Sequence, residues 1–430
     1  MAKKNLLHTL TGKKKEKKDL LFRVLDFRSP VITKASGLML TDEDERNYLD
    51  FASGQLCSCL GHSHPRLVGA ITEQVGKSIH LGSRFLSDSV LEAAEKFAAI
   101  TPKKLEKTVF LSTGTEANEF ALRCGKAYNE KNVVAGFDRG YYGSSNYMGG
   151  LSHPGNKRGI TYPAEDAAKI TTPYCARCPL NKEYPSCSIA CIEKSREELD
   201  RFDGQVSSFI VEPVLSAGGM IVPPKGYFKK LSELAREHDA LLVADEAQTG
   251  LGRTGRWFGF EHWGGVVPDV LVVSKSAGGG YPVSAVITSR EIEEGVRKKG
   301  FSHISSHMND PLGAKVFSTV VDVIGKERLV ENAESMGAYL KEKLDGVKAR
   351  HAEVVSDVRG AGLMVGVELS GDGEATEKKA MSIESSCLEN GLVLGYGSFY
   401  GVFRLCPPLT VTKEDIDEAA AIFERALAEE

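Results

Sequence analysis

Four short apolar runs divide the middle of the chain, at residues 109–113, 209–214, 240–245 and 270–274. They lack the polar alternation of a half-exposed strand, so each is predicted to be a strand buried on both faces. Helical patterns lie between them, for example at residues 116–128 and 228–238. Repeated strand–helix units indicate an open α/β sheet whose functional site lies at the carboxyl ends of the strands.

The two ends of the chain show a different pattern. Short strand-like runs occur at residues 38–40 and 48–51. A long helical stretch at 321–350 precedes a strand at 365–369 and a final helix from Lys413. We therefore expect three parts: an N-terminal segment (1–64) that joins the small domain, a large α/β domain (65–325) and a smaller C-terminal α+β domain (326–430).

Composition narrows the class of protein. The 430 residues are 42% hydrophobic and 26% charged with a net charge of −4, so nothing favours nucleic acid or a membrane surface as a partner. No apolar run approaches the roughly 20 residues that span a bilayer, and the basic N-terminus lacks the apolar core of a secretory signal. The nine cysteines, an odd number, favour a reducing compartment. We expect a cytoplasmic protein.

Three polar motifs follow the predicted strands. The sequence STGTEAN at 112–118 opens a helix whose N-terminus suits a phosphate, although an ordinary helix cap explains it as well. Asp245 ends an apolar strand, where a buried acid needs a cationic partner, either a protonated pyridine nitrogen or a structural ion pair. Lys275 leaves another strand into a glycine run, where it is either a desolvated nucleophile toward a carbonyl cofactor or a solvated loop lysine. Together, in this order, they are the layout of a pyridoxal 5′-phosphate (PLP) site.

From about residue 30 to the C-terminus, the sequence resembles the class-III (ω-) aminotransferases among the fold-type-I PLP enzymes. The resemblance is carried by YLDFASGQLCSCLGHSHPRL, LSTGTEANEFALR, ADEAQTGLGRTGRWFGFEHWGGVVPDVLVVSKSAGGG and GVFRLCPPLTV. It implies a large domain with a mostly parallel sheet flanked by helices, and a smaller α+β domain. Within the family the chain looks most similar to the 2,2-dialkylglycine decarboxylases, through EPVLSAGG, SHMNDP and VFRLCPPLTVTKEDID.

The resemblance also implies roles for single residues. Lys275 would bind PLP as an imine and move protons, and Asp245 would pair with the pyridine nitrogen. Gln55 and Arg404 would bind the substrate carboxylate, for which the arginine fork is well matched. The remaining cofactor-binding residues would be Thr113, Gly114, Thr115, Tyr141, Glu212, Gln248 and, from a neighbouring subunit, Ser305. A site shared in this way implies a homodimer or a tetramer of dimers.

Two positions bear on the type of reaction. Gln55 stands where the decarboxylases have a glutamine that contacts the departing carboxylate. Ala217 stands where many family members have a glutamate that neutralises the carboxylate-binding arginine. Both favour an α-amino acid and a 2-oxo acid such as pyruvate as substrates, with or without loss of CO2. Tyr141 and Ile304 depart from the decarboxylase pattern and leave the side-chain specificity open. A racemase or PLP-dependent lyase is the alternative enzyme, and a non-catalytic cofactor-binding protein is the alternative of another class.

An alkali-metal site is a further implication of the resemblance. Ser83, Ser306 and Asp310 would give side-chain oxygens to K+ or Na+, and Leu81 and Met308 would give backbone carbonyls. A hydrogen-bonded cluster without metal fits the same residues.

Four of the cysteines form a motif of their own. Cys175, Cys178, Cys187 and Cys191 make two close pairs within 17 residues. Zinc or an iron–sulfur cluster could bind such a set. Reduced or disulfide-linked cysteines in a surface insertion are the alternative, because the spacing between the pairs is shorter than in common zinc ribbons.

Overall fold

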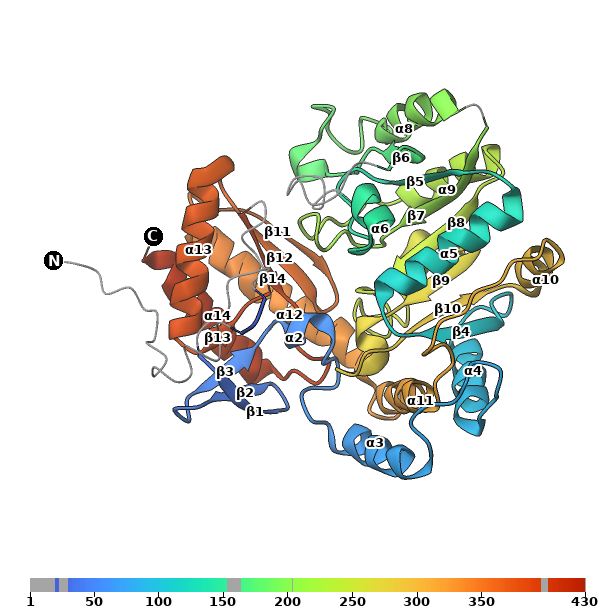
Figure 1. Cartoon of the computed structure of the whole chain (residues 1–430). Helices are drawn as coiled ribbons and strands as arrows, with labels where there is room; N and C mark the ends of the chain where they lie inside the picture. The colour runs from blue at the N-terminus through green and yellow to red at the C-terminus, as the bar shows by residue number, and fades with distance from the viewer. Residues whose placement is uncertain (1–19, 23–29, 153–163, 203, 396–400, 430) are drawn as a thin grey trace.

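The computed structural model describes residues 20–22, 30–152, 164–202, 204–395 and 401–429. In Figure 1 the chain forms a larger body around a long sheet and a smaller body in which strands from residues 32–50 lie beside the last helices. No helix among these residues is long and apolar enough to cross a membrane.

A seven-stranded sheet forms the centre of the larger body, in the order β4-β10-β9-β8-β7-β5-β6. Neighbouring strands are parallel except at β10, which runs antiparallel to both β4 and β9. The mostly parallel sheet predicted from the sequence is therefore confirmed. The strand bounds are β4 (Lys107–Leu111), β5 (Val133–Phe137), β6 (Ala167–Ile170), β7 (Val206–Val211), β8 (Leu241–Glu246), β9 (Val270–Val273) and β10 (Ser284–Thr288).

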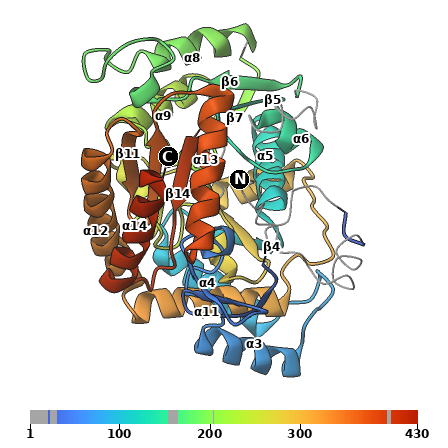
Figure 2. The same ribbon diagram turned by 90° about the vertical axis from the view of Figure 1, so that its left-hand side faces the viewer.

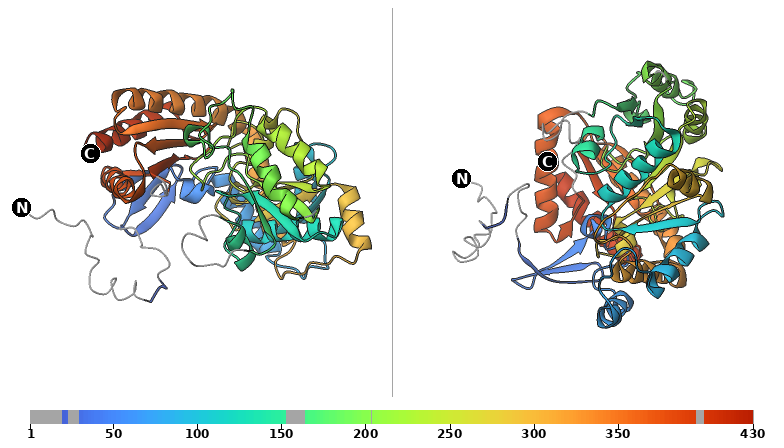
Figure 3. Two further views of the ribbon diagram at one scale, coloured as in Figure 1. Left: turned by 90° about the horizontal axis from the view of Figure 1, so that it is seen from above. Right: turned by 45° about the vertical axis from the view of Figure 1, so that its right-hand side comes forward.

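Helices cover both faces of this sheet, as Figure 3 shows. Along β8, Leu241 and Val243 belong to the apolar cluster that holds α5, α6 and α10, whereas Leu242 and Ala244 belong to the cluster on the opposite face. This alternation explains why the strands read as continuous apolar runs. The first set is α5 (Gly114–Asn129), α6 (Asn146–Leu151) and α10 (Arg290–Lys298). The second is α4 (Asp88–Ile100), α8 (Cys191–Leu199), α9 (Tyr227–Glu237) and α11 (Pro311–Lys326), and α3 (Pro65–Lys77) packs against α11.

The smaller body contains two sheets. The antiparallel sheet is β11 (Val355–Ala361), β12 (Met364–Leu369) and β14 (Val402–Leu405), and the other is β1 (Ile32–Ser36), β2 (Met39–Asp42), β3 (Asn47–Asp50) and β13 (Leu392–Val393). Because β3 pairs with β13, the N-terminal strands are built into the C-terminal part of the chain. Three helices accompany these sheets, as Figure 2 shows: α12 (Leu329–Arg350), α13 (Gly373–Glu389) and α14 (Lys413–Ala428).

The helical stretch expected at 321–350 proves to be two helices. Helix α11 ends at Lys326 and α12 begins at Leu329, because Arg328 adopts a left-handed conformation with φ of 54°. The residues at the break, KER, carry neither proline nor glycine. The sequence therefore lacks the usual signal for a helix end at this point.

Candidate active site

The carboxyl ends of β4, β7, β8 and β9 open into one pocket of about 140 Å³. Most of the predicted cofactor-binding residues lie in its wall. The residues that line it are Gly114, Thr115, Asn118, Tyr141, Tyr142, Gly143, Glu212, Val214, Asp245, Ala247, Gln248, Ser274 and Lys275. Parallel strands end at one edge of a sheet, which is why residues more than a hundred positions apart meet here.

The turn after β4 forms an anion-binding end of this pocket. Thr113 caps α5, and its hydroxyl accepts a hydrogen bond from the Glu116 N–H at 3.2 Å. The first N–H groups of a helix lack intrahelical acceptors and lie at the partially positive end of the helix dipole, so they suit a phosphate. A Cβ at Gly114 would lie 3.3 Å from the Cβ of Ser274. Glycine therefore permits the close approach of this turn to the lysine-bearing strand.

Asp245 lies at the end of β8 and is 5% exposed. Its carboxylate accepts hydrogen bonds from the side-chain amide of Asn118 at 2.8 Å and from the Ala247 N–H at 3.0 Å. Burial raises the pKa of Asp245, and these hydrogen bonds oppose the rise. Neither donor carries charge, and the charge of the nearby Lys275 amine also lowers the pKa of Asp245, so a cation in the pocket favours the ionised form of Asp245. The sequence analysis missed Asn118, although it belongs to the STGTEAN motif and lies one turn along α5.

Lys275 follows β9 and opens a 3-10 turn, η4 (Lys275–Gly278). Its φ of 43° is left-handed, a conformation that costs a non-glycine residue roughly 1–2 kcal/mol. Burial lowers the pKa of the Lys275 amine, while the nearby Asp245 and Glu212 act in the opposite direction. A strained, desolvated lysine in a pocket is typical of a functional residue.

Glu212 and Tyr141 contact each other in the same pocket as Asp245. The Glu212 carboxyl, 3% exposed, accepts a hydrogen bond from the Tyr141 N–H at 2.9 Å. Burial raises the pKa of Glu212 to about 8, with a smaller contribution from Asp245. Gln248, which is 8% exposed, lines the same pocket. Burial therefore favours the protonated form of the Glu212 carboxyl.

Arg404 reaches the site from the smaller body. It lies on β14, its guanidinium donates to the Ser216 hydroxyl at 3.3 Å, and it is close enough to Lys275 to act on the amine electrostatically. Gln55, by contrast, is exposed and lies outside the set of residues that line the pocket. Its contact with a substrate carboxylate stays a prediction.

Gln55 lies in an unusual turn, α2 (Ser53–Leu56), whose residues have positive φ: 45° at Ser53, 52° at Gly54, 71° at Gln55 and 64° at Leu56. Arg253, fully buried, donates to the Ser53 hydroxyl at 3.4 Å, and that hydroxyl donates to the Cys406 carbonyl. The turn is thus attached to the segment that follows β14.

The carboxylate of Asp310 contacts two histidines. It accepts from Nδ1 of His80 at 2.6 Å and from Nδ1 of His307 at 2.5 Å. Among the described residues, these three form the one group of His, Cys, Asp or Glu ligand atoms that all lie within 4.8 Å of one another. Each carboxylate oxygen of Asp310 thus accepts one hydrogen bond from a histidine. The alkali-metal site at Ser83, Ser306 and Asp310 stays a prediction, as does the role of Ser305 from a second subunit.

Comparison with known proteins decides the family. A model of the family described as aminotransferase class-III matches residues 26–427. The chain belongs to this family. An uncharacterized aminotransferase of Schizosaccharomyces pombe is 38% identical over 435 residues, covering 99% of this chain and 97% of that protein. As a class-III aminotransferase, the enzyme uses PLP.

Two further similarities are informative. The leucine/methionine racemase of Thermococcus litoralis is 36% identical over 410 residues, covering 93% of this chain and 90% of the racemase. The ω-transaminase of Pseudomonas jessenii in complex with PMP superposes with a TM-score of 0.88 at 27% identity, covering 96% of this chain and 97% of that one. The finer resemblance to the 2,2-dialkylglycine decarboxylases stays a prediction.

The pocket of this class-III aminotransferase fits its cofactor. The buried Asp245 has no charged hydrogen-bond donor, which suits a protonated pyridine nitrogen, and the start of α5 suits the phosphate. Among the described residues, the buried carbonyl oxygen of the Asn118 amide finds no hydrogen-bond partner. Thr113, Gly114 and Thr115 would hold the phosphate, and Tyr141 and Gln248 would bound the ring.

Proposed function

We propose that this aminotransferase transfers the amino group of an α-amino acid to a 2-oxo acid such as pyruvate, in the manner of 2,2-dialkylglycine decarboxylase, with or without loss of CO2. The position of Arg404 carries the proposal. Its guanidinium lies within electrostatic reach of Lys275 and beside Ser216. An arginine fork binds a carboxylate through two parallel hydrogen bonds. A substrate held there would present its α-carbon to the lysine.

Ala217 supports this choice of substrate. It follows Ser216, the residue whose hydroxyl contacts Arg404. An alanine side chain brings no negative charge to this side of the arginine, so a substrate carboxylate meets no carboxylate repulsion from position 217. Substrates with an α-carboxylate are therefore favoured over simple amines.

The chain's own groups divide the chemistry between them. PLP, when bound, supplies a carbonyl that condenses with amines and a ring that accepts electrons from the substrate α-carbon. Asp245 keeps a proton on the ring nitrogen by its negative charge. Burial lowers the pKa of the Lys275 amine, so more of it is neutral at physiological pH than of an exposed lysine. The neutral amine can take a proton from the α-carbon and later return it. Arg404 fixes the carboxylate and so decides which bond faces the ring.

The first experiment supplies the PLP-loaded enzyme with 2-aminoisobutyrate and pyruvate. This amino acid has no α-hydrogen, so its amino group can reach pyruvate only if CO2 leaves, giving acetone, CO2 and alanine. Formation of all three would support the decarboxylating reaction. Alanine formation from ordinary amino acids alone would leave a conventional aminotransferase and overturn the decarboxylating part.

Racemisation is the second candidate, because the Thermococcus litoralis relative is named a leucine/methionine racemase. The test of racemisation against amino transfer incubates the enzyme with single enantiomers of leucine and methionine and without a 2-oxo acid. Chiral chromatography then analyses the products. Inversion without any oxo acid product would favour the racemase. An absolute need for the oxo acid acceptor would favour amino transfer.

A variant tests the carboxylate contact directly. Arg404→Lys keeps the charge but loses the planar fork. We expect kcat/KM for an amino acid to fall about 100-fold, a loss of about 2.7 kcal/mol. Turnover of an amine with the same side chain but no carboxylate should change little. An equal loss for both substrates would argue against the assigned contact.

A further inference from the structure

The segment between β6 and α8 has little regular structure. It contains one short 3-10 turn, η1 (Cys175–Arg177), before α8 begins at Cys191. Most of residues 175–188 are exposed, so this segment buries few apolar side chains. Chain segments too small to build a core are typically held by metal ions or disulfides.

The four clustered cysteines surround a common space in this segment. Cys175, Cys178, Cys187 and Cys191 all line one pocket. The Cys191 thiol lies close enough to interact electrostatically with the other three, and Cys175 does so with Cys178 and Cys187. All four are free thiols. Residues that are at most 16 positions apart in the chain thus bring four sulfur ligands to one pocket.

The four sulfurs lie farther apart than the ligands of a bound metal ion do. They do not form a group within 4.8 Å of one another, whereas sulfurs around tetrahedral zinc are about 3.8 Å apart. Rotation of a cysteine side chain between staggered rotamers moves its sulfur by roughly 3 Å. Binding of an ion would therefore require side-chain rotations of this kind.

We propose that Cys175, Cys178, Cys187 and Cys191 form a tetrathiolate site that binds one Zn2+. Thiolates are the soft ligands that zinc accepts in structural sites, and four of them leave no open coordination position for catalysis. Binding replaces the four thiol protons, which pass to solvent, and no group is oxidised or reduced. The ion would hold the segment in a single conformation.

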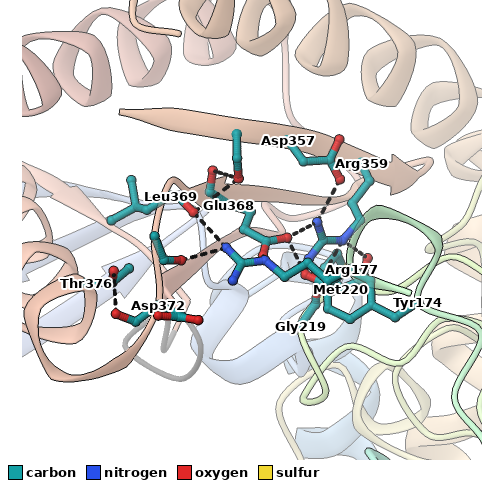
Figure 4. Close-up of polar contacts among 12 residues, drawn as sticks. Tyr174, Arg177, Gly219, Met220, Asp357, Arg359, Glu368, Leu369, Asp372 and Thr376 are labelled. Atoms are coloured by element: carbon teal, nitrogen blue, oxygen red, sulfur yellow. Dashed lines mark hydrogen bonds and ion pairs between the residues drawn. The ribbon is translucent and has the colours of Figure 1, made fainter. Parts of the chain in front are cut away.

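Figure 4 shows what this segment holds in place. Arg177, in η1, donates to the carbonyls of Leu369 at 3.1 Å and Gly371 at 2.8 Å, and it pairs with Glu368. Tyr174, which precedes the first cysteine, donates to the same Glu368 carboxylate. Glu368 lies on β12, the strand that pairs with the Arg404-bearing β14. The zinc site would thus fasten the larger body to the sheet that carries the proposed carboxylate-binding residue.

The test begins with metal analysis of the full-length, PLP-loaded enzyme, purified without a histidine tag or chelator. Elemental analysis by plasma emission spectrometry should find about one zinc ion per chain and negligible iron. Replacement of zinc by Co2+ should produce the visible ligand-field bands and the thiolate-to-cobalt charge-transfer band of tetrahedral sulfur coordination. Both readouts are independent of catalytic activity.

Variants locate the site. Cys178→Ser should lose most of the zinc and the cobalt spectrum, whereas Cys124→Ser, which removes a thiol outside the cluster, should keep both. Should Cys178→Ser fail to fold, the cobalt spectrum of the wild-type enzyme still decides. Iron in place of zinc would overturn the proposal. So would metal-free protein with four fewer reactive thiols when denatured, because the cysteines would then be paired as disulfides.

Discussion

At the scale of single residues, the site could be predicted where a reactive side chain follows an apolar strand. Asp245 lies near the end of such a strand and Lys275 closely follows another, so their place at the sheet edge was open to prediction. Asn118 was not, because its partner Asp245 is 127 residues away in the chain. Helical periodicity predicts that a residue points inward, but it does not predict which group from another part of the chain that residue contacts.

Asn118 should contribute to cofactor binding through Asp245. Removing its amide in Asn118→Ala leaves the buried carboxylate with one hydrogen-bond donor fewer, which costs about 1–2 kcal/mol. We expect PLP to bind roughly 10-fold more weakly, as measured by titrating the apoenzyme and following cofactor absorbance. Asn129→Ala is the matched control, since Asn129 ends the same helix and binds the Ser207 carbonyl away from the pocket. Equal effects of both changes would contradict this role.

Glu212 should make the cofactor-free enzyme less stable as the pH rises. Its pKa is about 8 in the folded protein against an ordinary value of 4.5. The unfolded chain therefore loses this proton first, and the free energy of unfolding falls between about pH 4.5 and pH 8, by an amount on the order of a few kcal/mol. Glu212→Gln should flatten this part of the pH profile of thermal unfolding.

A second variant separates the titration of Glu212 from the titration of exposed carboxyl groups at acidic pH. Glu237→Gln changes an exposed carboxyl whose pKa is lowered by Arg196, so its contribution to stability is lost only at acidic pH. It should leave the slope between pH 5 and pH 8 unchanged. An unaltered slope in Glu212→Gln would show that another group titrates there.

At the scale of elements, periodicity predicted the types of helices and strands better than their ends. The buried strands of the large sheet read as apolar runs because both faces are covered. The direction of β10 was beyond prediction, since an antiparallel strand buried on both faces carries the same pattern as a parallel one. The break at Arg328 was hidden because a residue other than glycine takes the left-handed conformation there.

The break between α11 and α12 offers a test of backbone strain. Arg328 is left-handed and exposed, and its side chain makes one surface contact, with Glu331. Arg328→Gly should be about 1 kcal/mol more stable than Arg328→Ala, because only glycine adopts this conformation without a steric penalty. Chemical denaturation of the two variants measures the difference, and the shared loss of the side chain cancels. An alanine variant as stable as the glycine variant would refute the assignment.

At the scale of the whole molecule, the sequence indicated the parts but not their joints. The pairing of β3 with β13 links residues more than 300 positions apart, and no local pattern encodes it. The junction between the two bodies is equally non-local. Arg359 there donates to the carbonyls of Gly219 and Met220, both at 3.1 Å, and to Asp357 at 2.7 Å, and it also pairs with Glu368.

Loss of Arg359 should destabilise the junction. Glu368 is 1% exposed, so Arg359→Met removes one of the cations that keep a buried carboxylate compensated. We expect a loss of about 3 kcal/mol in the free energy of unfolding. Arg350→Met, which breaks a more exposed pair with Glu424, should cost clearly less, because solvent screens that pair. Chemical denaturation measures both losses, and equal losses would contradict the stabilising role of Arg359 at the junction.

The turn at residues 53–56 limits how this site could be transplanted. A four-residue stretch with positive φ throughout winds with the opposite hand to an ordinary helical turn, and its non-glycine residues resist that hand. The hydroxyl of Ser53, attached to Arg253 and Cys406, holds it. A designer who grafted only SGQL onto another scaffold would obtain a right-handed turn that points its glutamine elsewhere. The smallest portable unit therefore includes Arg253 and the strand that carries Arg404.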